Sequence, residues 1–462
     1  MIRLFQVYVP ASVLGVLVGD LAILLACYTL PALATDLAAE IYLFDEGGLA
    51  RSAFVVFCIA LGLHYNDLYS NLRIRWRSLL LQQICVAIGV AFLVQAVLIY
   101  IYPPGILPRG LMFIGSALAL FSLLAWRIAY SRLIRGFGVQ RLLFLGNSEA
   151  VVEIVRRLNA HPEWGLRPLG YLADEAPAED SGHQGFRHLG AIGEIREVVA
   201  AHNPDRLVVG MAERRRRMPV DQLVALRFSG VRVEEAAALY EMALGRICLA
   251  SLRPSSLIFA SELGPRRGKL LAQAVYSALI AVAAFVVAIP VMLAAAAAIK
   301  LTSRGPVLYR QTRVGLNGAP FVLYKFRSMR ADAESVSGAV WAQEDDPRIT
   351  PVGRWLRRLR LDELPQLFNV LKGEMSIVGP RPERPEFVRT LEQQIPFYRQ
   401  RHSVRPGITG WAQINHKYGN TLEDAVIKLE YDLYYIKNLT VSLDFVIMFQ
   451  TAKIMLLWRG AH

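Results

Sequence analysis

Four long apolar stretches dominate the first 130 residues of the chain. They cover about Val13–Leu33, Leu49–Leu63, Leu79–Tyr102 and Gly110–Tyr130. A helix needs about 20 apolar residues to span a bilayer, and only the second stretch is clearly shorter than that. Arg3 is the only charge ahead of the first stretch, which lacks a small-residue cleavage site, so we expect a retained span rather than a signal peptide. The pattern predicts a four-helix transmembrane bundle over residues 1–135.

The charges between these stretches predict the orientation of the bundle. The first loop is mainly acidic, whereas basic residues follow the second and fourth stretches: Arg73, Arg75, Arg77, Arg132 and Arg135. Because basic residues mark the cytoplasmic side of a membrane, both ends of the bundle are expected to face the cytoplasm. The rest of the chain then begins on that side.

Residues 136–264 return to a mixed pattern with short apolar runs. Strands are predicted at Arg141–Leu145, Leu207–Gly210 and Val231–Val233, and a helix at Val151–Leu158. This alternation is typical of a Rossmann-like α/β domain. Only Gly146 fits the glycine spacing of a dinucleotide site, so we expect a structural or regulatory domain without bound NAD. The Arg214–Arg217 run predicts a solvated face, with phosphate or lipid contact as the alternative.

A fifth apolar run, Leu270–Ile299, differs from the first four. Its thirty uncharged residues would form a helix of about 45 Å, long enough to cross a membrane. Basic residues nevertheless flank both of its ends, and Pro290 interrupts its backbone hydrogen bonding. A kinked re-entrant helix over residues 270–299, which enters and leaves by the cytoplasmic face, satisfies both observations. A plain fifth span with a proline kink is the alternative.

Composition narrows the function classes. The 462 residues are 54% hydrophobic and 19% charged, with a net charge of +13, which excludes disorder and fits a membrane protein better than a cytosolic enzyme. A basic and hydrophobic chain favours acidic lipids or phosphorylated substrates over nucleic acid. The four cysteines form no CxxC pair, so neither disulfides nor a thiolate metal site is expected.

The final part of the chain, residues 265–462, carries the candidate chemistry. From residue 300 onward it holds 24 Lys and Arg against 16 Asp and Glu, which is a net +8. The basic residues cluster around five short motifs, in the order Tyr324–Arg330, Asp345–Thr350, Arg357–Leu367, Met375–Glu383 and Arg405–Gln413.

Asp362 and Glu363 stand out within these motifs. They precede a predicted helix over Leu364–Leu371, where acidic residues are ordinary capping groups. Arginines directly before them would lower the pKa of both carboxyls and keep them ionised. Carboxylates in such surroundings suit a phosphate or Mg²⁺ site, and one can serve as a nucleophile on phosphorus. Adjacent helical positions do not face each other, so we expect the two groups to have different roles.

The five motifs, in this order, resemble those of the bacterial sugar transferase family. These polyprenyl-phosphate hexose-1-phosphate transferases start exopolysaccharide and O-antigen assembly. The whole layout resembles the long members of the family. The resemblance implies that residues 265–462 form a monotopic α/β catalytic domain, anchored by a re-entrant membrane helix broken at Pro290. The family often has Ser before this proline, where this chain has Ile289.

The resemblance also implies roles for individual residues. Asp362 would be the nucleophile and Glu363 its partner carboxylate, and both would serve as ligands of Mg²⁺. Phosphate and nucleotide contacts would come from Lys325, Arg327, Arg357 and Arg381, with Pro382 and Glu383 in the loop on the nucleotide side. For each basic residue, contact with acidic headgroups is the alternative.

The implied reaction transfers a hexose-1-phosphate from a UDP-sugar to undecaprenyl phosphate through a phosphosugar–aspartate, with release of UMP. The implied location is the bacterial inner membrane, with the catalytic domain on its cytoplasmic face; a homodimer is compatible with the sequence. The alternative function is a catalytically inactive membrane scaffold or nucleotide-sensing regulator. Val441–Trp458 is expected to lie on the membrane interface, and His402 and His416 are expected to be polar surface residues without partners.

Overall fold

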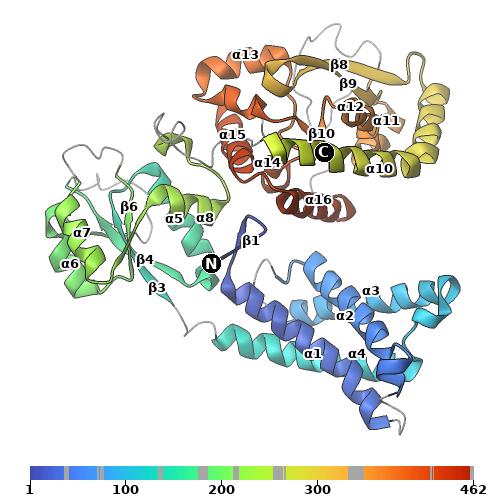
Figure 1. Ribbon diagram of the computed structural model, residues 1–462, viewed down its shortest axis with the longest axis horizontal. Coiled ribbons are helices and arrows are strands. Elements are labelled where there is room, and N and C mark those ends of the chain that lie inside the picture. The colour runs from blue at the N-terminus through green and yellow to red at the C-terminus, as the bar shows by residue number, and fades with distance from the viewer. Residues whose placement is uncertain are drawn as a thin grey trace. The chain divides into compact units, whose positions relative to one another are not determined.

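The computed structural model divides the chain into two compact units. One unit comprises Met1–Arg3 and Tyr8–Glu234, and the other comprises Leu4–Val7 and Glu235–His462 (Figure 1). We refer to them as the N-terminal unit and the catalytic unit, the second after the catalytic domain that the family resemblance implies. The structure describes residues 1–35, 41–69, 72, 77–133, 139–174, 186–211, 218–252, 264, 267–330, 348–416, 419 and 421–457. Outside these ranges lie Arg73, Arg75, Arg135, the Arg214–Arg217 run and the acidic start of the second motif, Asp345 and Asp346.

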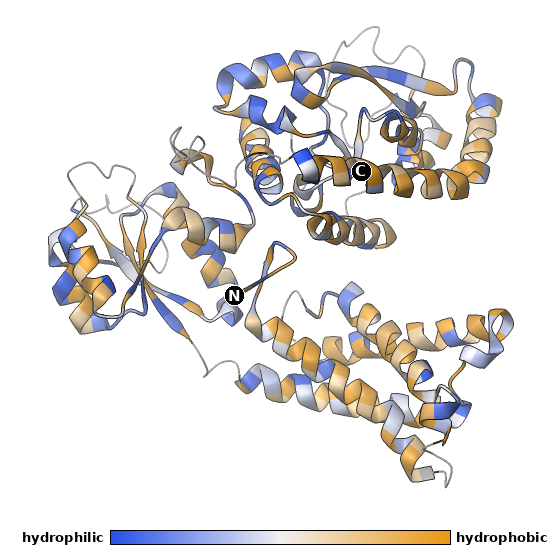
Figure 2. Cartoon of the chain, viewed as in Figure 1, coloured by the Kyte–Doolittle hydropathy of each residue, from blue (hydrophilic) through white to orange (hydrophobic). Residues whose placement is uncertain are grey.

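The four apolar stretches form four long helices of the N-terminal unit, as predicted. These are α1 (Ala11–Thr35), α2 (Gly48–Tyr65), α3 (Arg77–Ile101) and α4 (Arg109–Leu133), which follow the short strands β1 (Ile2–Leu4) and β2 (Val7–Val9). Helix α1 packs on α4 and α2 packs on α3. All four are long and apolar enough to cross a membrane, and hydrophobic residues, coloured orange in Figure 2, predominate along them.

A buried ion pair accounts for the one charge inside the first helix. Asp20 is fully buried and pairs with Arg127 of α4. Tyr69 donates a hydrogen bond to the same carboxylate at 2.9 Å, and Arg127 also bonds the carbonyl of Leu68 at 2.9 Å. Mutual neutralisation of this kind is how ionisable groups are accommodated inside apolar bundles. The pair therefore ties α1, α4 and the segment after α2 together.

The second half of the N-terminal unit is an α/β domain with a five-stranded sheet. The strand order is β5-β4-β3-β6-β7, and the pairings β5–β4, β4–β3 and β3–β6 are parallel. The helix and the three strands predicted from the sequence are confirmed, as α5, β3, β6 and β7. The bounds are β3 (Gln140–Leu145), α5 (Glu149–Ala160), β4 (Leu166–Leu172), β5 (His188–Gly190), α6 (Ile195–His202), β6 (Arg206–Val209), α7 (Val220–Phe228) and β7 (Arg232–Glu235).

Strand β4 has no clear signal in the sequence because it contains Pro168 and Gly170, two residues that disfavour strands. The structure accommodates them at a bulge. Leu142 and Leu143 of β3 pair with Pro168 and Gly170, which leaves Leu169 as an extra residue in the ladder.

The catalytic unit mixes helices with two small sheets. Its antiparallel pair is β8 (Leu308–Val314) with β9 (Pro320–Phe326), and its parallel pair is β10 (Ser376–Val378) with β11 (Gly407–Thr409). A buried core that includes Val378, Trp411 and Leu433 joins these sheets to the helices. The helices are α8 (Ala236–Leu244), α10 (Arg267–Thr302), α11 (Pro351–Arg358), α12 (Gln366–Leu371), α13 (Pro385–Gln394), α14 (Trp411–Asn415), α15 (Leu422–Lys437) and α16 (Val441–Leu456).

Helix α10 is the fifth long apolar helix, and Pro290 lies inside it. Its axis changes direction along its length in Figure 1. Its first half packs on β10 and α16, where Gln273 donates to the carbonyl of Val378 at 3.2 Å. Its second half packs on β9 and α11 through a cluster that includes Ala295 and Ile299. Both halves therefore contact the same unit.

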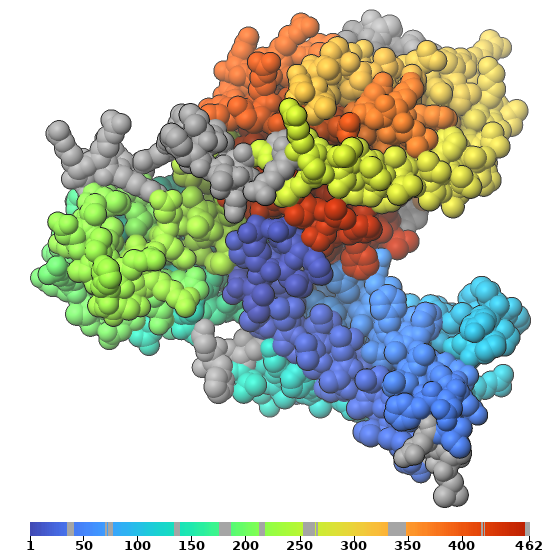
Figure 3. Space-filling model, in the orientation of Figure 1, coloured from blue at the N-terminus to red at the C-terminus, as the bar shows by residue number. Residues whose placement is uncertain are grey.

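Helix α16 lies beside the first half of α10 in Figure 3. Its two interior charges are turned inward, since Asp444 is fully buried and Lys453 is 6% exposed. Phe445 and Phe449 are exposed on its outer side. Asp444 accepts hydrogen bonds from Gln273 and Tyr276, which links α16 directly to α10.

Two histidines differ from the prediction of unpartnered surface residues. His402 is buried, with 7% of its surface exposed, because the turn at Tyr398–Ser403 folds into the core. His416 is paired, since its Nε2 lies 3.0 Å from Asp424 Oδ1. The sequence pattern around each residue is polar, and only tertiary packing decides its burial or its partner.

Candidate active site

A short 3₁₀ turn, η7 (Leu361–Glu363), carries the two adjacent carboxylates between α11 and α12. Thr350 caps α11 by accepting a hydrogen bond from the amide of Gly353 at 2.9 Å. Arg360 comes two residues after the end of α11 and has a left-handed backbone conformation, with φ 55°. This conformation turns the chain so that η7 can begin. The carboxylates thus lie in a tight turn ahead of α12.

Glu363 is held between three cations. Its Oε1 accepts from Nζ of Lys325 at 3.2 Å and from a guanidinium nitrogen of Arg381 at 3.0 Å. Its Oε2 lies 4.0 Å from the guanidinium of Arg360. Burial alone would raise the pKa of Glu363, but Arg381, Lys325 and Arg360 outweigh it and hold that pKa well below its usual range. Glu363 is therefore ionised at neutral pH.

Asp362 has the opposite surroundings. Its side chain is 8% exposed, and its carboxylate makes no hydrogen bond or ion pair with any other residue that the structure describes. Burial and the adjacent charge of Glu363 raise the pKa of Asp362 to about 6, against the opposing effects of Lys325 and Arg357. The expectation that arginines lower both pKa values is therefore wrong for Asp362, because the sequence does not show its burial.

The remaining predicted site residues separate into two groups. Pro382 and Glu383 directly follow Arg381, which binds Glu363, and they are held by Arg313 of β8, which donates to the Pro382 carbonyl at 3.0 Å and lies 3.7 Å from Glu383 Oε2. Arg327 lies elsewhere and bonds the carbonyls of Ser303 and Arg304 at 3.0 and 2.9 Å. It thereby fastens the end of α10 to β9.

A buried ion pair supports the loop that carries Arg381. Arg401 lies 2.8 Å from Asp432 of α15 and donates to the carbonyl of Arg381 at 3.0 Å. Arg401, Arg313 and Arg360 were not singled out from the sequence. Many arginines precede or follow these motifs, and only the tertiary fold selects which of them reach the carboxylates.

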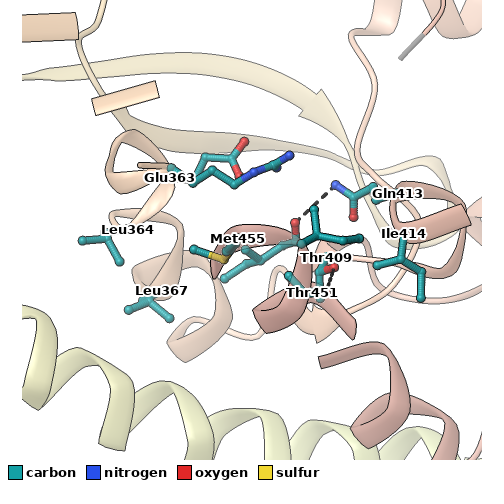
Figure 4. A pocket seen from close by; sticks show the side chains of 11 residues that line it. Glu363, Leu364, Leu367, Thr409, Gln413, Ile414, Thr451 and Met455 are labelled. Carbon is teal, nitrogen blue, oxygen red and sulfur yellow. Dashed lines mark hydrogen bonds and ion pairs between the residues drawn. The ribbon is translucent and has the colours of Figure 1, made fainter. Parts of the chain in front are cut away.

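An apolar cavity adjoins Glu363 (Figure 4). It has a volume of about 150 Å³. Its walls come from η7 and α12, from the β11–α14 segment and from α16. The charged site and this cavity are neighbours within one unit.

Comparisons with known proteins identify the family. A family model described as bacterial sugar transferase matches residues 269–458, and one described as CoA-binding domain matches residues 64–234. A UDP-glucose:undecaprenyl-phosphate glucose-1-phosphate transferase of Xanthomonas campestris pv. campestris is 35% identical over 359 residues, which are 74% of this chain and 72% of the relative. The chain belongs to the bacterial sugar transferase family.

Other relatives match a shorter part of the chain, little more than a third of its length. A UDP-N-acetylgalactosamine-undecaprenyl-phosphate N-acetylgalactosaminephosphotransferase of Aeromonas hydrophila is 53% identical over 37% of this chain and 41% of its own length. A UDP-glucose:undecaprenyl-phosphate glucose-1-phosphate transferase of Escherichia coli (strain K12) is 49% identical over 35% of each chain. These matches confirm the family inferred from the five motifs and make the protein a transferase.

Proposed function

We propose that the protein transfers a hexose-1-phosphate from a UDP-sugar to undecaprenyl phosphate, releases UMP and so starts exopolysaccharide or O-antigen assembly. The observation that carries this proposal is the contrast within the carboxylate pair. Glu363 is fixed as an anion between Lys325 and Arg381, whereas Asp362 is buried next to it without a partner among the described residues. An unpaired carboxylate beside fixed cations suits attack on a phosphorus atom.

The reaction has two displacements. Oδ of Asp362 attacks the sugar-linked phosphorus, an aspartyl–phosphorus bond forms, and the bond from that phosphorus to the UMP oxygen breaks. A phosphate oxygen of undecaprenyl phosphate then attacks the same phosphorus, and the aspartyl–phosphorus bond breaks to regenerate Asp362. With a pKa of about 6, Asp362 is mostly ionised at neutral pH and needs no separate base. Lys325 and Arg381 are placed to bind the phosphate oxygens.

The donor set fits a magnesium ion bound together with substrate. No group of three or more His, Cys, Asp or Glu in the described ranges forms a ready-made metal cage. Mg²⁺, however, is commonly held by one or two carboxylates plus substrate phosphates. Asp362, which has no hydrogen-bond or ion-pair partner among the described residues, and Oε2 of Glu363 would hold it, and the ion would neutralise charge on the diphosphate.

We also propose that α10 is a re-entrant membrane helix and that α1–α4 span the inner membrane, with the catalytic unit on the cytoplasmic face. A straight helix that crossed the bilayer could pack only one end on a domain at one side, whereas both halves of α10 pack on the catalytic unit. Its outward residues are apolar and more than half exposed at Val275, Leu279, Val286 and Leu293, which suits contact with lipid.

The test is an assay of UMP release by the purified protein with undecaprenyl phosphate and a panel of UDP-sugars. The panel includes UDP-glucose and UDP-N-acetylgalactosamine, because the names of the relatives divide between these sugars. At least one sugar should release UMP in step with formation of a lipid-linked product. Absence of UMP with every sugar would favour the inactive scaffold instead.

A further inference from the structure

The cavity beside Glu363 has a charged end and an apolar body. Arg360 and Glu363 line the charged end. The body is lined by the apolar side chains of Leu364, Leu367, Ile408, Ile414, Ile454 and Met455. Figure 4 labels Leu364, Leu367, Ile414 and Met455 among them. Three polar side chains complete the wall. The hydroxyls of Thr409 and Thr451 lie 2.6 Å apart, and Gln413 donates from Nε2 to the carbonyl of Ile408 at 3.3 Å, while its Oε1 has no partner among the described residues. The body is therefore mainly apolar, with one amide oxygen as a hydrogen-bond acceptor.

The apolar body reaches the outer surface of the unit through α16. Met455 lines the cavity and is still 46% exposed, and its neighbour Leu456 is 67% exposed. Helix α16 packs beside α10, the helix with the exposed apolar side chains. The cavity thus connects the carboxylate turn with the apolar surface that we assign to the membrane.

This combination fits only one of the two proposed substrates. A UDP-sugar has no hydrocarbon chain, and burial of its phosphates and hydroxyls against Leu and Ile side chains costs free energy. A polyprenyl phosphate has an anionic head joined directly to a branched hydrocarbon, which matches a charged end and an apolar body. The volume of about 150 Å³ is about five times the ~30 Å³ share of a water molecule, so it accepts a short segment and not the whole chain.

We propose that this cavity binds the isoprene unit next to the phosphate of the lipid acceptor, with Arg360 beside that phosphate. The inference rests on the proposed function, because it assigns a place to one of its substrates. Arg360 and the cavity would then determine recognition of the acceptor, while Lys325 and Arg381 on the other side of Glu363 serve the donor. Held in this way, the acceptor phosphate lies next to Asp362.

The experiment fills the cavity from its exposed edge and measures both substrates. Met455→Trp places a bulky ring at the cavity, and Leu456→Trp is the matched control, an adjacent and more exposed residue that does not line it. For Met455→Trp, KM for undecaprenyl phosphate should rise about tenfold or more, because the tryptophan ring would occupy the space that binds the hydrocarbon of the acceptor. KM for the UDP-sugar should stay within about twofold in both variants.

Equal KM values for the acceptor in the two variants, or an equal rise for both substrates, would overturn the assignment. If Met455→Trp does not fold, Ile414→Ala enlarges the cavity from another element and should raise the KM for the acceptor alone. An unchanged KM for the acceptor in Ile414→Ala would also overturn the assignment of the cavity. Failure of the proposed function gives a different result, because the unaltered protein would then release no UMP.

Discussion

At the scale of the residue, the proposed chemistry rests on two adjacent carboxylates with different surroundings. The sequence could predict that Asp362 and Glu363 have different roles, because neighbouring positions in a turn or helix point in different directions. It could not predict that Lys325 and Arg381, 38 and 18 residues away from Glu363, bind it while Asp362 pairs with no residue in the part of the chain that the structure describes. Those contacts form because the fold brings β9, which carries Lys325, and the loop after β10, which carries Arg381, next to η7.

This difference predicts opposite effects of two isosteric substitutions on stability. Asp362→Asn removes a buried charge that has no ion-pair partner among the described residues, so it should leave the melting temperature unchanged or higher while it abolishes UMP release. Glu363→Gln leaves Lys325 and Arg381 without their counterion and should cost about 2 kcal/mol. Thermal unfolding of both variants in detergent tests this. A lower melting temperature for Asp362→Asn than for Glu363→Gln would contradict the assigned charge states.

His402 predicts a dependence of stability on acid. Burial, together with Arg401 and Arg399, lowers the pKa of His402 from 6.5 to about 4. The unfolded chain takes up a proton on this residue as the pH falls below 6.5, whereas the folded protein does not until about pH 4. The stability contributed by His402 is thus fully present above pH 6.5 and is lost as the pH falls toward 4.

The variant His402→Asn should accordingly lose less stability in acid than the unaltered protein. Melting temperatures at pH 7.5, 5.5 and 4.5, compared as differences between the two proteins, isolate this contribution from that of other groups. Identical pH dependence in the two proteins would show that His402 is free to protonate in the folded state.

At the scale of the element, the features that predict the course of helix α10 are all visible in the sequence. Basic residues at both ends and Pro290 within predict a helix that does not cross the membrane, and the packing of both halves on one unit supports that prediction. Strand β4 shows the opposite situation. Its Pro168 and Gly170 argue against a strand, and only pairing with β3 around the bulge at Leu169 permits one.

The re-entrant arrangement predicts that both ends of α10 are accessible from the same side of the membrane. Single cysteines introduced by Gly268→Cys and Thr302→Cys, on a background without the four native cysteines, should react with an impermeant maleimide from the cytoplasmic side only. Pro104→Cys, in the loop between α3 and α4, is the matched control and should react from the opposite side. Labelling of the two α10 positions from opposite sides would establish a fifth span.

At the scale of the whole molecule, the chain separates a membrane bundle with an α/β domain from the unit that holds the carboxylate pair. All the described partners of Glu363 belong to the catalytic unit. Composition could indicate a basic membrane protein, and motif order could indicate its family. Neither could assign the cavity to a position next to Glu363, because its walls come from segments far apart in the sequence.

This separation predicts that damage to the bundle lowers stability without altering the chemistry. Asp20→Asn leaves Arg127 buried without its counterion, which costs about 3–5 kcal/mol. The variant should unfold at a lower temperature, yet release UMP at an unchanged rate per folded molecule. A changed KM for either substrate in the folded fraction would instead show that the bundle takes part in the reaction.

The most direct test of the central claim is to look for the covalent intermediate on Asp362. The purified protein is incubated with the active UDP-sugar in the absence of acceptor, and intact-mass and peptide mass spectrometry follow. We predict the mass of one sugar phosphate on the peptide that contains Asp362, formed together with one equivalent of UMP, lost on addition of undecaprenyl phosphate and absent in Asp362→Asn. Full transfer activity in Asp362→Asn, or UMP release without any adduct on this residue, would contradict the account.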